Sequence, residues 1–218
     1  ITKRLQEDPT DRRCVLAMWD CVKDLDRDTK DTPCNTHIYF KVRNNKLNMT
    51  VCCRSNDMIW GAYGANAVHM SMLHEYIAAH AGYHVGKYYQ FSNDYHAYEE
   101  IYGKLIKGLG GFDPTSVSAI LDLMEVNPYK LGQVSYYPMV SVSREAWDED
   151  LHRFLARRPF DTFSPYEEKF FNDVAVPMQD AWALHKLGKT EEAMDEIQNC
   201  EASDWKKACG EWFKRRIN

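Results

Sequence analysis

The sequence predicts an α/β fold whose first half combines strands with helices and whose second half is mainly helical. Two observations carry this prediction. Apolar and polar residues alternate on both sides of Asn44-Asn45, which is the pattern of a β-hairpin. After about residue 112, helical periodicity and capping signals dominate. With 44% hydrophobic and 27% charged residues among 218, the composition is that of an ordinary globular protein.

Local patterns place the elements of the first half. We expect a strand at 14–19, hairpin strands at 36–43 and 47–53, a helix at 66–81 and a strand at 88–91. Two consecutive asparagines suit the hairpin turn because Asn tolerates positive φ. Gly82 supplies the stop of the helix, because glycine adopts the left-handed conformation that ends helices.

The second half is expected to contain helices at 113–125, 144–156, 165–187, 190–199 and 202–216. Ser164-Pro165-Tyr166-Glu167 has the form of a capping box at the start of the third helix. Gln133–Val142 is the one stretch that looks like a strand. We expect a single domain, with an α/β core over 1–112 and a helical extension over 113–218.

Composition and charge exclude several classes of function. A net charge of −5 argues against a surface for duplex nucleic acid, and no apolar run is long enough to cross a membrane. Seven cysteines, an odd number without a paired framework, favour reduced thiols and a cytoplasmic location. His69, His74 and His80 do not share a helical face, and Cys52 and Cys53 point to opposite faces of a strand, so no metal site is expected.

Several residues could carry chemistry. Cys34 follows Pro33 in a loop before the hairpin, and Arg54 ends the second hairpin strand, so the folded hairpin brings them together. A guanidinium favours a thiolate and can bind a phosphate bidentately. The alternatives are a buried structural cysteine and, for Arg54 and for the pair Arg12-Arg13, surface salt bridges.

His96 and Tyr98 are two residues apart, which places both on one face of a strand as hydrogen-bonding groups suited to a sugar hydroxyl. The order of all these motifs resembles the thymidylate synthase and pyrimidine hydroxymethylase family over about residues 1–102. The motifs are Arg12-Arg13 before an apolar strand, Pro33-Cys34, Arg54-Ser55-x-Asp57, Gly61 followed by Asn66, and Asp94-x-His96-x-Tyr98.

The resemblance implies a mixed sheet covered by helices and a role for each matching residue. Cys34 would be the thiolate that adds to C6 of a pyrimidine ring, which turns C5 into a carbon nucleophile. Asn66 would pair with the O4/N3 edge of the base, while His96 and Tyr98 would hold the 3′-hydroxyl. Asp57 would lie against the pterin of the co-substrate, 5,10-methylenetetrahydrofolate.

The resemblance also implies how the phosphate is bound. Arg54 and Ser55 would hold the 5′-phosphate, and Arg12 and Arg13 would reach the phosphate bound by the other subunit of a homodimer. The implied catalytic set is Cys34, Arg54, Asn66 and Asp57.

The activity implied is transfer of a one-carbon unit to C5 of a deoxypyrimidine monophosphate, preferably dUMP, with a methyl product. A hydroxymethyl product, from dUMP or dCMP, is an alternative. A catalytically silent nucleotide-binding or scaffold protein is a competitor from another class.

The chain also departs from the family pattern. Asn35 stands where the family usually has His, and Cys53 stands where it usually has Gln. One extra residue separates Gly61 from Asn66, and Asn66 is preferred over Ala65 because alanine cannot pair with a base. The family's amino-terminal segment and its water-excluding tail have no counterpart in this sequence.

Overall fold

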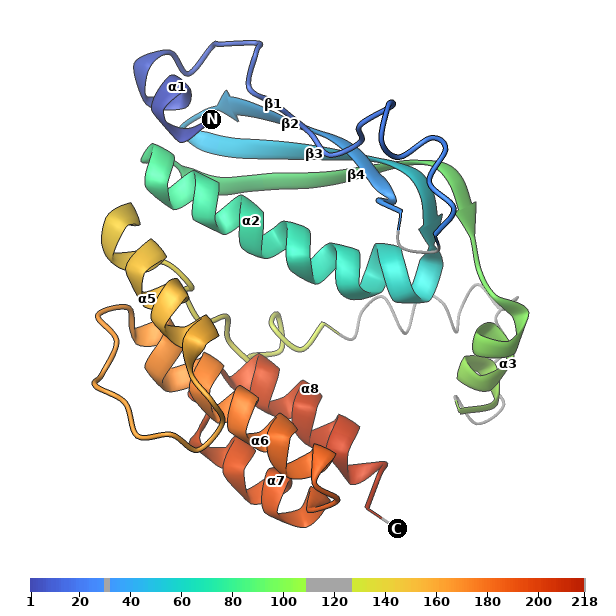
Figure 1. Cartoon of the computed structure of the whole chain (residues 1–218), viewed down its shortest axis with the longest axis vertical. Helices are drawn as coiled ribbons and strands as arrows, with labels where there is room; N and C mark the ends of the chain where they lie inside the picture. Colours follow the sequence, from blue (N-terminus) through green and yellow to red (C-terminus); the bar gives the residue numbers. More distant parts are fainter. Residues whose placement is uncertain (30–31, 109–126, 218) are drawn as a thin grey trace. The chain divides into compact units, whose positions relative to one another are not determined.

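The structure is a computed structural model that describes residues 1–29, 32–108 and 127–217 (Figure 1). The helix expected at 113–125 lies outside these residues. The chain divides into two compact units, residues 1–115 and 116–218.

The first unit contains a four-stranded sheet and several helices. Its elements are α1 (Thr2–Glu7), β1 (Val15–Ala17), β2 (Asn35–Arg43), β3 (Lys46–Asp57), the π-helical segment η1 (Met58–Ala65), α2 (Asn66–Ala81), β4 (His84–His96) and α3 (Glu99–Gly108).

The sheet is mixed, in the order β1-β2-β3-β4, which confirms the expected α/β class. β1 pairs with β2, and β2 with β3, in antiparallel fashion, whereas β3 and β4 are parallel and joined through η1 and α2. Asn44 and Asn45 have φ of 52° and 59°, so the hairpin turn is confirmed. α2 begins and ends at the same residues as the helix expected at 66–81.

One face of the sheet packs on α2, and this contact forms the core of the first unit (Figure 1). The core residues of these three elements are Ile38, Phe40 and Val42 of β2, Leu47, Met49, Val51 and Cys53 of β3, and Met70, Ile77, Ala78 and Ala81 of α2. His74 of α2 adds a hydrogen bond between the helix and β3: its Nε2 lies 2.6 Å from the Leu47 carbonyl oxygen. On the opposite face, Tyr39, Tyr89 and Phe91 are 46%, 47% and 66% exposed.

Three strands differ in length from the expectation by more than one residue. β3 runs to Asp57, four residues beyond the expected end at 53. β1 is only three residues long, within the apolar run 14–19. β4 extends from His84 to His96, well beyond 88–91, because parallel pairing with β3 continues to the register pair Asp57 and His96. Backbone pairing along β3 imposes this length on a segment whose own apolar pattern is weak.

The second unit is helical. Its described elements are α5 (Arg144–Ala156), the π-helical segment η2 (Phe171–Ala175), α6 (Val176–Lys186), α7 (Thr190–Glu196), the 3₁₀ turn η3 (Ile197–Asn199) and α8 (Ser203–Lys214). The helix expected at 144–156 is confirmed. The segment expected at 190–199 forms α7 followed by the 3₁₀ turn η3, and α8 matches the helix expected at 202–216 within two residues.

Two expectations for the second unit are wrong. The third helix begins near Lys169, not at the capping box Ser164–Glu167, and residues 133–142 form no strand. Buried Glu168 explains both differences: its carboxylate accepts from the Ser141 hydroxyl at 2.9 Å, and its N–H donates to Asp150. These hydrogen bonds join both segments to partners distant in sequence, and neither segment takes the expected form.

None of the described helices combines the length and the apolar character that crossing a bilayer would require. All seven cysteines are free thiols.

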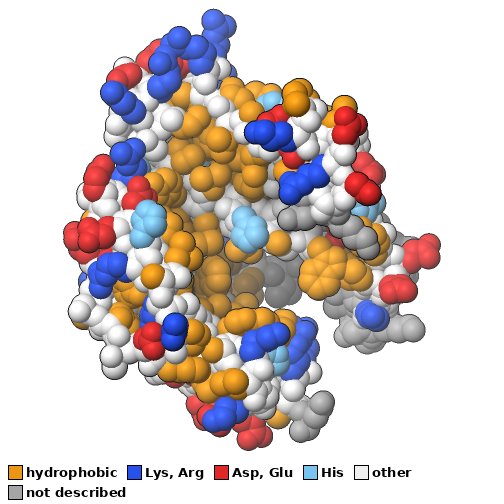
Figure 2. All heavy atoms as spheres, viewed as in Figure 1, with side chains coloured by type: hydrophobic (Ala, Val, Ile, Leu, Met, Phe, Trp, Pro, Cys, Tyr) orange, Lys and Arg blue, Asp and Glu red, His pale blue; other side chains and the backbone are white. Residues whose placement is uncertain are grey.

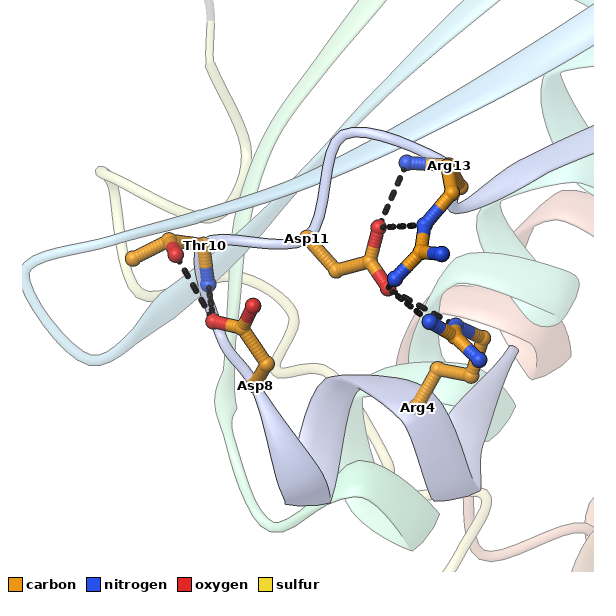
Figure 3. A network of polar contacts seen from close by, with 5 residues as sticks. All are labelled: Arg4, Asp8, Thr10, Asp11 and Arg13. Atoms are coloured by element: carbon orange, nitrogen blue, oxygen red, sulfur yellow. Dashed lines mark hydrogen bonds and ion pairs between the residues drawn. The ribbon is translucent and has the colours of Figure 1, made fainter.

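Asp11 organises a polar cluster in the loop between α1 and β1 (Figure 3). Its carboxylate accepts from the Arg13 backbone N–H at 2.8 Å, from the Arg13 guanidinium at 3.0 Å and from Arg4 Nε at 2.7 Å. Lys and Arg side chains gather over α1 and this loop (Figure 2), which contain Lys3, Arg4, Arg12 and Arg13. The hydrogen bonds from Arg13, and then that from Arg4, hold the pKa of Asp11 well below its usual range.

Gly82→Ala should destabilise the first unit. Gly82 ends α2 with φ of 81° and donates its N–H to Ala78 and Ala79. A left-handed conformation costs a residue with a Cβ about 1–2 kcal/mol, and the new methyl group meets no atom within 4 Å. Urea unfolding measures the loss. The control is Gly103→Ala within α3, which should raise the free energy of unfolding by up to about 1 kcal/mol; equal effects of the two changes would contradict this account.

Asp11→Asn should lower stability in a pH-dependent manner. Because the pKa of Asp11 is lowered from 3.8 by folding, its stabilising contribution is fully present above that value and is lost as the pH falls toward the folded pKa. The difference in free energy of unfolding between wild type and Asp11→Asn should be constant above about pH 5 and shrink below about pH 4. Urea unfolding at a series of pH values tests this, and a difference that persists undiminished at low pH would contradict it.

Candidate active site

Most of the candidate residues lie at one end of the sheet. The parallel strands β3 and β4 both end there, with Ser55 opposite Asp94 and Asp57 opposite His96. β2 begins at the same end, because Asn35 pairs with Cys53, and the first residue of α2, Asn66, follows η1. The topology therefore brings together segments that are far apart in sequence.

Cys34 lies directly before β2 with its side chain exposed. Arg54 holds the loop that carries it: its backbone N–H donates to the Cys34 carbonyl at 2.9 Å, and its guanidinium donates to Pro33 and Thr32 carbonyls at 2.9 and 3.2 Å. The guanidinium also lies 5.5 Å from the ring centre of Trp19. The structure thus brings the expected cation to the thiol loop.

Four side-chain amides connect this loop to β4, and we call them the amide relay: Asn35, Asn66, Asn56 and Gln90. Asn35 Nδ2 donates to Asn66 Oδ1 at 3.5 Å, and Asn66 Nδ2 donates to Asn56 Oδ1 at 3.1 Å. Asn56 Nδ2 donates to Gln90 Oε1 at 2.8 Å and to the Ser92 hydroxyl at 3.0 Å. Asn66, rather than Ala65, therefore joins the polar network beside Cys34.

Both ends of the amide relay have defined partners. Gln90 Nε2 donates to the Ala62 carbonyl at 3.2 Å and to the Tyr88 hydroxyl at 2.6 Å. At the other end, Cys53 Sγ donates to Asn35 Oδ1 at 3.1 Å. Burial raises the pKa of the Cys53 thiol, and it raises that of Tyr88 to about 12, so both groups keep their hydrogens at neutral pH.

An open pocket of about 480 Å³ adjoins the Gln90 end of the relay. It is lined by Ala62, Tyr63, Tyr88, Gln90, Ser92 and Tyr95.

Asp57 caps the first turn of η1. Its Oδ1 accepts the backbone N–H groups of Ile59, at 3.0 Å, and of Trp60. Its Oδ2 is buried and has no hydrogen-bond partner among the described residues, while the neighbouring Trp60 is 62% exposed. The site therefore contains a carboxylate oxygen that can accept from a ligand, next to an exposed aromatic ring.

His96 and Tyr98 lie together, although Tyr98 is beyond the end of β4. Their rings are in edge contact with centres 5.4 Å apart, and His96 Nδ1 lies 3.7 Å from Asp94 Oδ2. The expectation that both residues belong to one strand is wrong for Tyr98, because β4 ends at His96. Ring contact, rather than strand alternation, keeps the pair together.

The loop between α1 and β1, which contains Arg12 and Arg13, lies at the other end of the sheet (Figure 1). The Cys14 carbonyl accepts from the Phe40 N–H, six residues along β2 from Cys34, which corresponds to roughly 20 Å. Arg13 is held by Asp11, whereas Arg12 is exposed and has no ion pair with the residues that the structure describes. Within one chain these arginines do not join the group around Cys34.

The arrangement suits nucleophilic chemistry on a polar planar ligand. It offers an exposed thiol beside an arginine, amides able to donate and accept, and a hydroxyl and imidazole pair. Among the described residues, no group of three or more His, Cys, Asp or Glu side chains is placed to hold a metal ion.

Sequence reasoning missed Asn56, Gln90, Ser92 and Trp60. A signal existed for two of them, since Gln90 and Ser92 are polar residues two apart on the sheet face that is otherwise apolar. Their partner Asn56 is more than thirty residues away, so nothing local linked them.

The family model described as thymidylate synthase matches residues 1–127, more than half of the chain. The chain is 40% identical over 221 aligned residues to a deoxyuridylate hydroxymethyltransferase of Pseudomonas phage M6, covering 99% of this chain and 61% of that protein. It is 39% identical over 107 residues to a protein of the same name from Bacillus phage SP01, covering 49% of this chain and 28% of the relative.

A solved structure, thermostable thymidylate synthase A from Bacillus subtilis, aligns at 29% identity with a TM-score of 0.44, over 50% of this chain and 38% of that one. The chain spans less than two thirds of the length of these relatives. On the strength of the family model, the chain belongs to the thymidylate synthase family.

Proposed function

We propose that this protein transfers a one-carbon unit from 5,10-methylenetetrahydrofolate to C5 of dUMP and that the product carries a hydroxymethyl group. The observation that carries the proposal is the exposed Cys34 thiol, on a loop whose backbone carbonyls accept hydrogen bonds from Arg54. The next residue, Asn35, contacts the Asn66 amide. The thymidylate synthase family uses this folate as co-substrate.

Cys34 begins the reaction by adding as thiolate to C6 of the uracil ring, which makes C5 a carbon nucleophile. Asn66 pairs with O4 and N3 and stabilises the negative charge that develops on O4. When bound, 5,10-methylenetetrahydrofolate supplies the carbon that C5 attacks. The C5 proton then leaves, and Cys34 departs from C6 as the product forms.

Other residues position the two ligands. Arg54 and Ser55 would bind the 5′-phosphate, because a guanidinium and a hydroxyl both donate to phosphate oxygens. His96 and Tyr98 would hold the 3′-hydroxyl. Asp57 fits the folate, because its buried Oδ2 lacks a donor that a pterin N–H can supply.

The choice of product depends on what reaches the new carbon after transfer. Hydride from the folate gives a methyl group and dihydrofolate, whereas water gives a hydroxymethyl group and leaves tetrahydrofolate. The relative from phage M6 aligns with 99% of this chain and is named for hydroxymethyl transfer, as is that from phage SP01. These names favour the hydroxymethyl product over the methyl product that the sequence alone suggested.

Cys34→Ser should abolish turnover, because a hydroxyl is a far weaker nucleophile than a thiolate at neutral pH. Mass spectrometry of the nucleotide after incubation of wild type with dUMP and the folate should show a gain of CH₂O. A gain of CH₂ would establish methyl transfer instead. The control for Cys34→Ser is Cys21→Ser, which alters another exposed thiol and should retain activity. Normal turnover by Cys34→Ser would refute the proposed nucleophile.

We further propose that the active unit is a cytoplasmic homodimer formed through the sheet. The face opposite α2 exposes the aromatic residues Tyr39, Tyr89 and Phe91, and a second copy would cover them. Arg12 and Arg13 are too far from Cys34 to bind the same phosphate within one chain, but a partner subunit can supply them.

Mixing two inactive variants tests the shared site. Arg12→Ala/Arg13→Ala lacks the arginines and Cys34→Ser lacks the nucleophile, so a heterodimer of the two contains one intact site. After subunit exchange, an equal mixture should regain about a quarter of wild-type activity, because half of the dimers are mixed and each has one working site. No recovery despite exchange, verified by native mass spectrometry, would argue against shared arginines.

A further inference from the structure

We propose that the amide relay fixes the direction of the Asn66 side-chain amide and that this fixed direction makes the site accept uracil and reject cytosine. The inference rests on the proposed function, in which Asn66 contacts the base. It assigns positioning roles to Asn56 and Gln90, which act through Asn66.

The direction of the amide matters because one asparagine can complement either base. Uracil presents an acceptor at O4 and a donor at N3, whereas cytosine presents an amino donor at C4 and an acceptor at N3. Turning the Asn66 amide by half a turn exchanges its oxygen and its NH₂ group, and so exchanges the base that it fits. An asparagine that turns freely would therefore discriminate poorly.

The relay receives its direction from the Ala62 backbone carbonyl, which can only accept. Gln90 must point Nε2 toward it, at 3.2 Å, and this leaves Gln90 Oε1 to accept from Asn56 Nδ2 at 2.8 Å. Asn56 must then point Oδ1 toward Asn66, whose Nδ2 donates to it at 3.1 Å. Each amide therefore fixes the orientation of the next, because rotating one of them by half a turn would bring two acceptor oxygens together.

The contacts at the opposite end of the relay agree with this direction. Asn66 Oδ1 accepts from Asn35 Nδ2, and Asn35 Oδ1 accepts from the Cys53 thiol at 3.1 Å. The Asn35 to Asn66 link is the longest, at 3.5 Å, but the shorter bond to Asn56 already orients Asn66. Burial raises the pKa of Cys53, so the thiol keeps the hydrogen that it donates.

The hydrogen-bonding capacity of Asn66 is divided evenly between protein and ligand. A side-chain amide has two donor hydrogens and two acceptor positions. The relay uses one of each, which leaves one donor and one acceptor for a base edge. Asn35 and Asn56 are 8% and 2% exposed, so water has little access to replace the relay bonds.

Gly61 lies against the Asn56 and Asn66 amides and leaves no room for a side chain. A Cβ at this position would lie 2.3 Å from Asn56 Oδ1 and 3.2 Å from Asn66 Nδ2. Any larger residue must push the two amides apart, so Gly61→Ala disturbs the Asn56 to Asn66 bond without removing a polar group.

The test compares dUMP with dCMP as substrates of the intact protein. The ratio of kcat/KM for dUMP to that for dCMP should fall roughly tenfold or more in Asn56→Leu and in Gly61→Ala, because the amide of Asn66 can then turn. Ser92→Ala is the matched control. It removes one acceptor of Asn56 but leaves Gln90 in place, so the ratio should stay within about threefold of wild type.

The ratio separates positioning from loss of structure, because misfolded protein lowers both rates equally. Where a variant no longer turns over, the ratio of dissociation constants from calorimetry should show the same fall. An unchanged ratio in both Asn56→Leu and Gly61→Ala, or a wild type that uses both nucleotides equally, would overturn the relay proposal alone. A wild type that converts neither nucleotide would overturn the proposed function and the relay proposal with it.

Discussion

Parallel pairing of β3 with β4 is the constraint on which the site depends. Parallel neighbours end at the same edge of a sheet, so the polar residues that follow the apolar part of β3 meet those at the end of β4. The antiparallel hairpin adds the start of β2, and with it Cys34, to the same edge. This topology brings together the loop that carries Cys34, the side-chain amides, and the rings of His96 and Tyr98. The core between the sheet and α2 holds them in position.

The transition from apolar to polar along β3 creates a second requirement. Val51 and Cys53 continue the core, but Asn56 is also buried, and a buried amide needs partners for its donors and its acceptor. Gln90, Ser92 and Asn66 supply them. A network of this kind specifies one arrangement, because each amide must point in a defined direction for its neighbours to be satisfied. The hydrogen bonds that satisfy the buried Asn56 amide are therefore the same ones that, in our proposal, orient Asn66 toward uracil.

Local chemistry in the sequence predicted the hairpin at Asn44-Asn45, the limits of α2 and its stop at Gly82, because turn and cap conformations depend on the residues themselves. It also predicted that Arg54 lies beside Cys34, since a hairpin register follows from its turn. The amide relay, the length of β4 and the irregular segments joined by Glu168 were not predictable in this way. Each depends on partners far away in sequence that only the folded chain brings together.

The most direct test of the account is a crystal structure of the intact protein trapped with 5-fluoro-dUMP and 5,10-methylenetetrahydrofolate. The fluorine cannot leave as the C5 proton does, so the covalent complex should accumulate. We predict a bond from Cys34 Sγ to C6, the Asn66 amide against O4 and N3, and Arg12 and Arg13 of the partner subunit at the 5′-phosphate. A covalent bond to another cysteine, or a base turned away from Asn66, would contradict the assignment of the site.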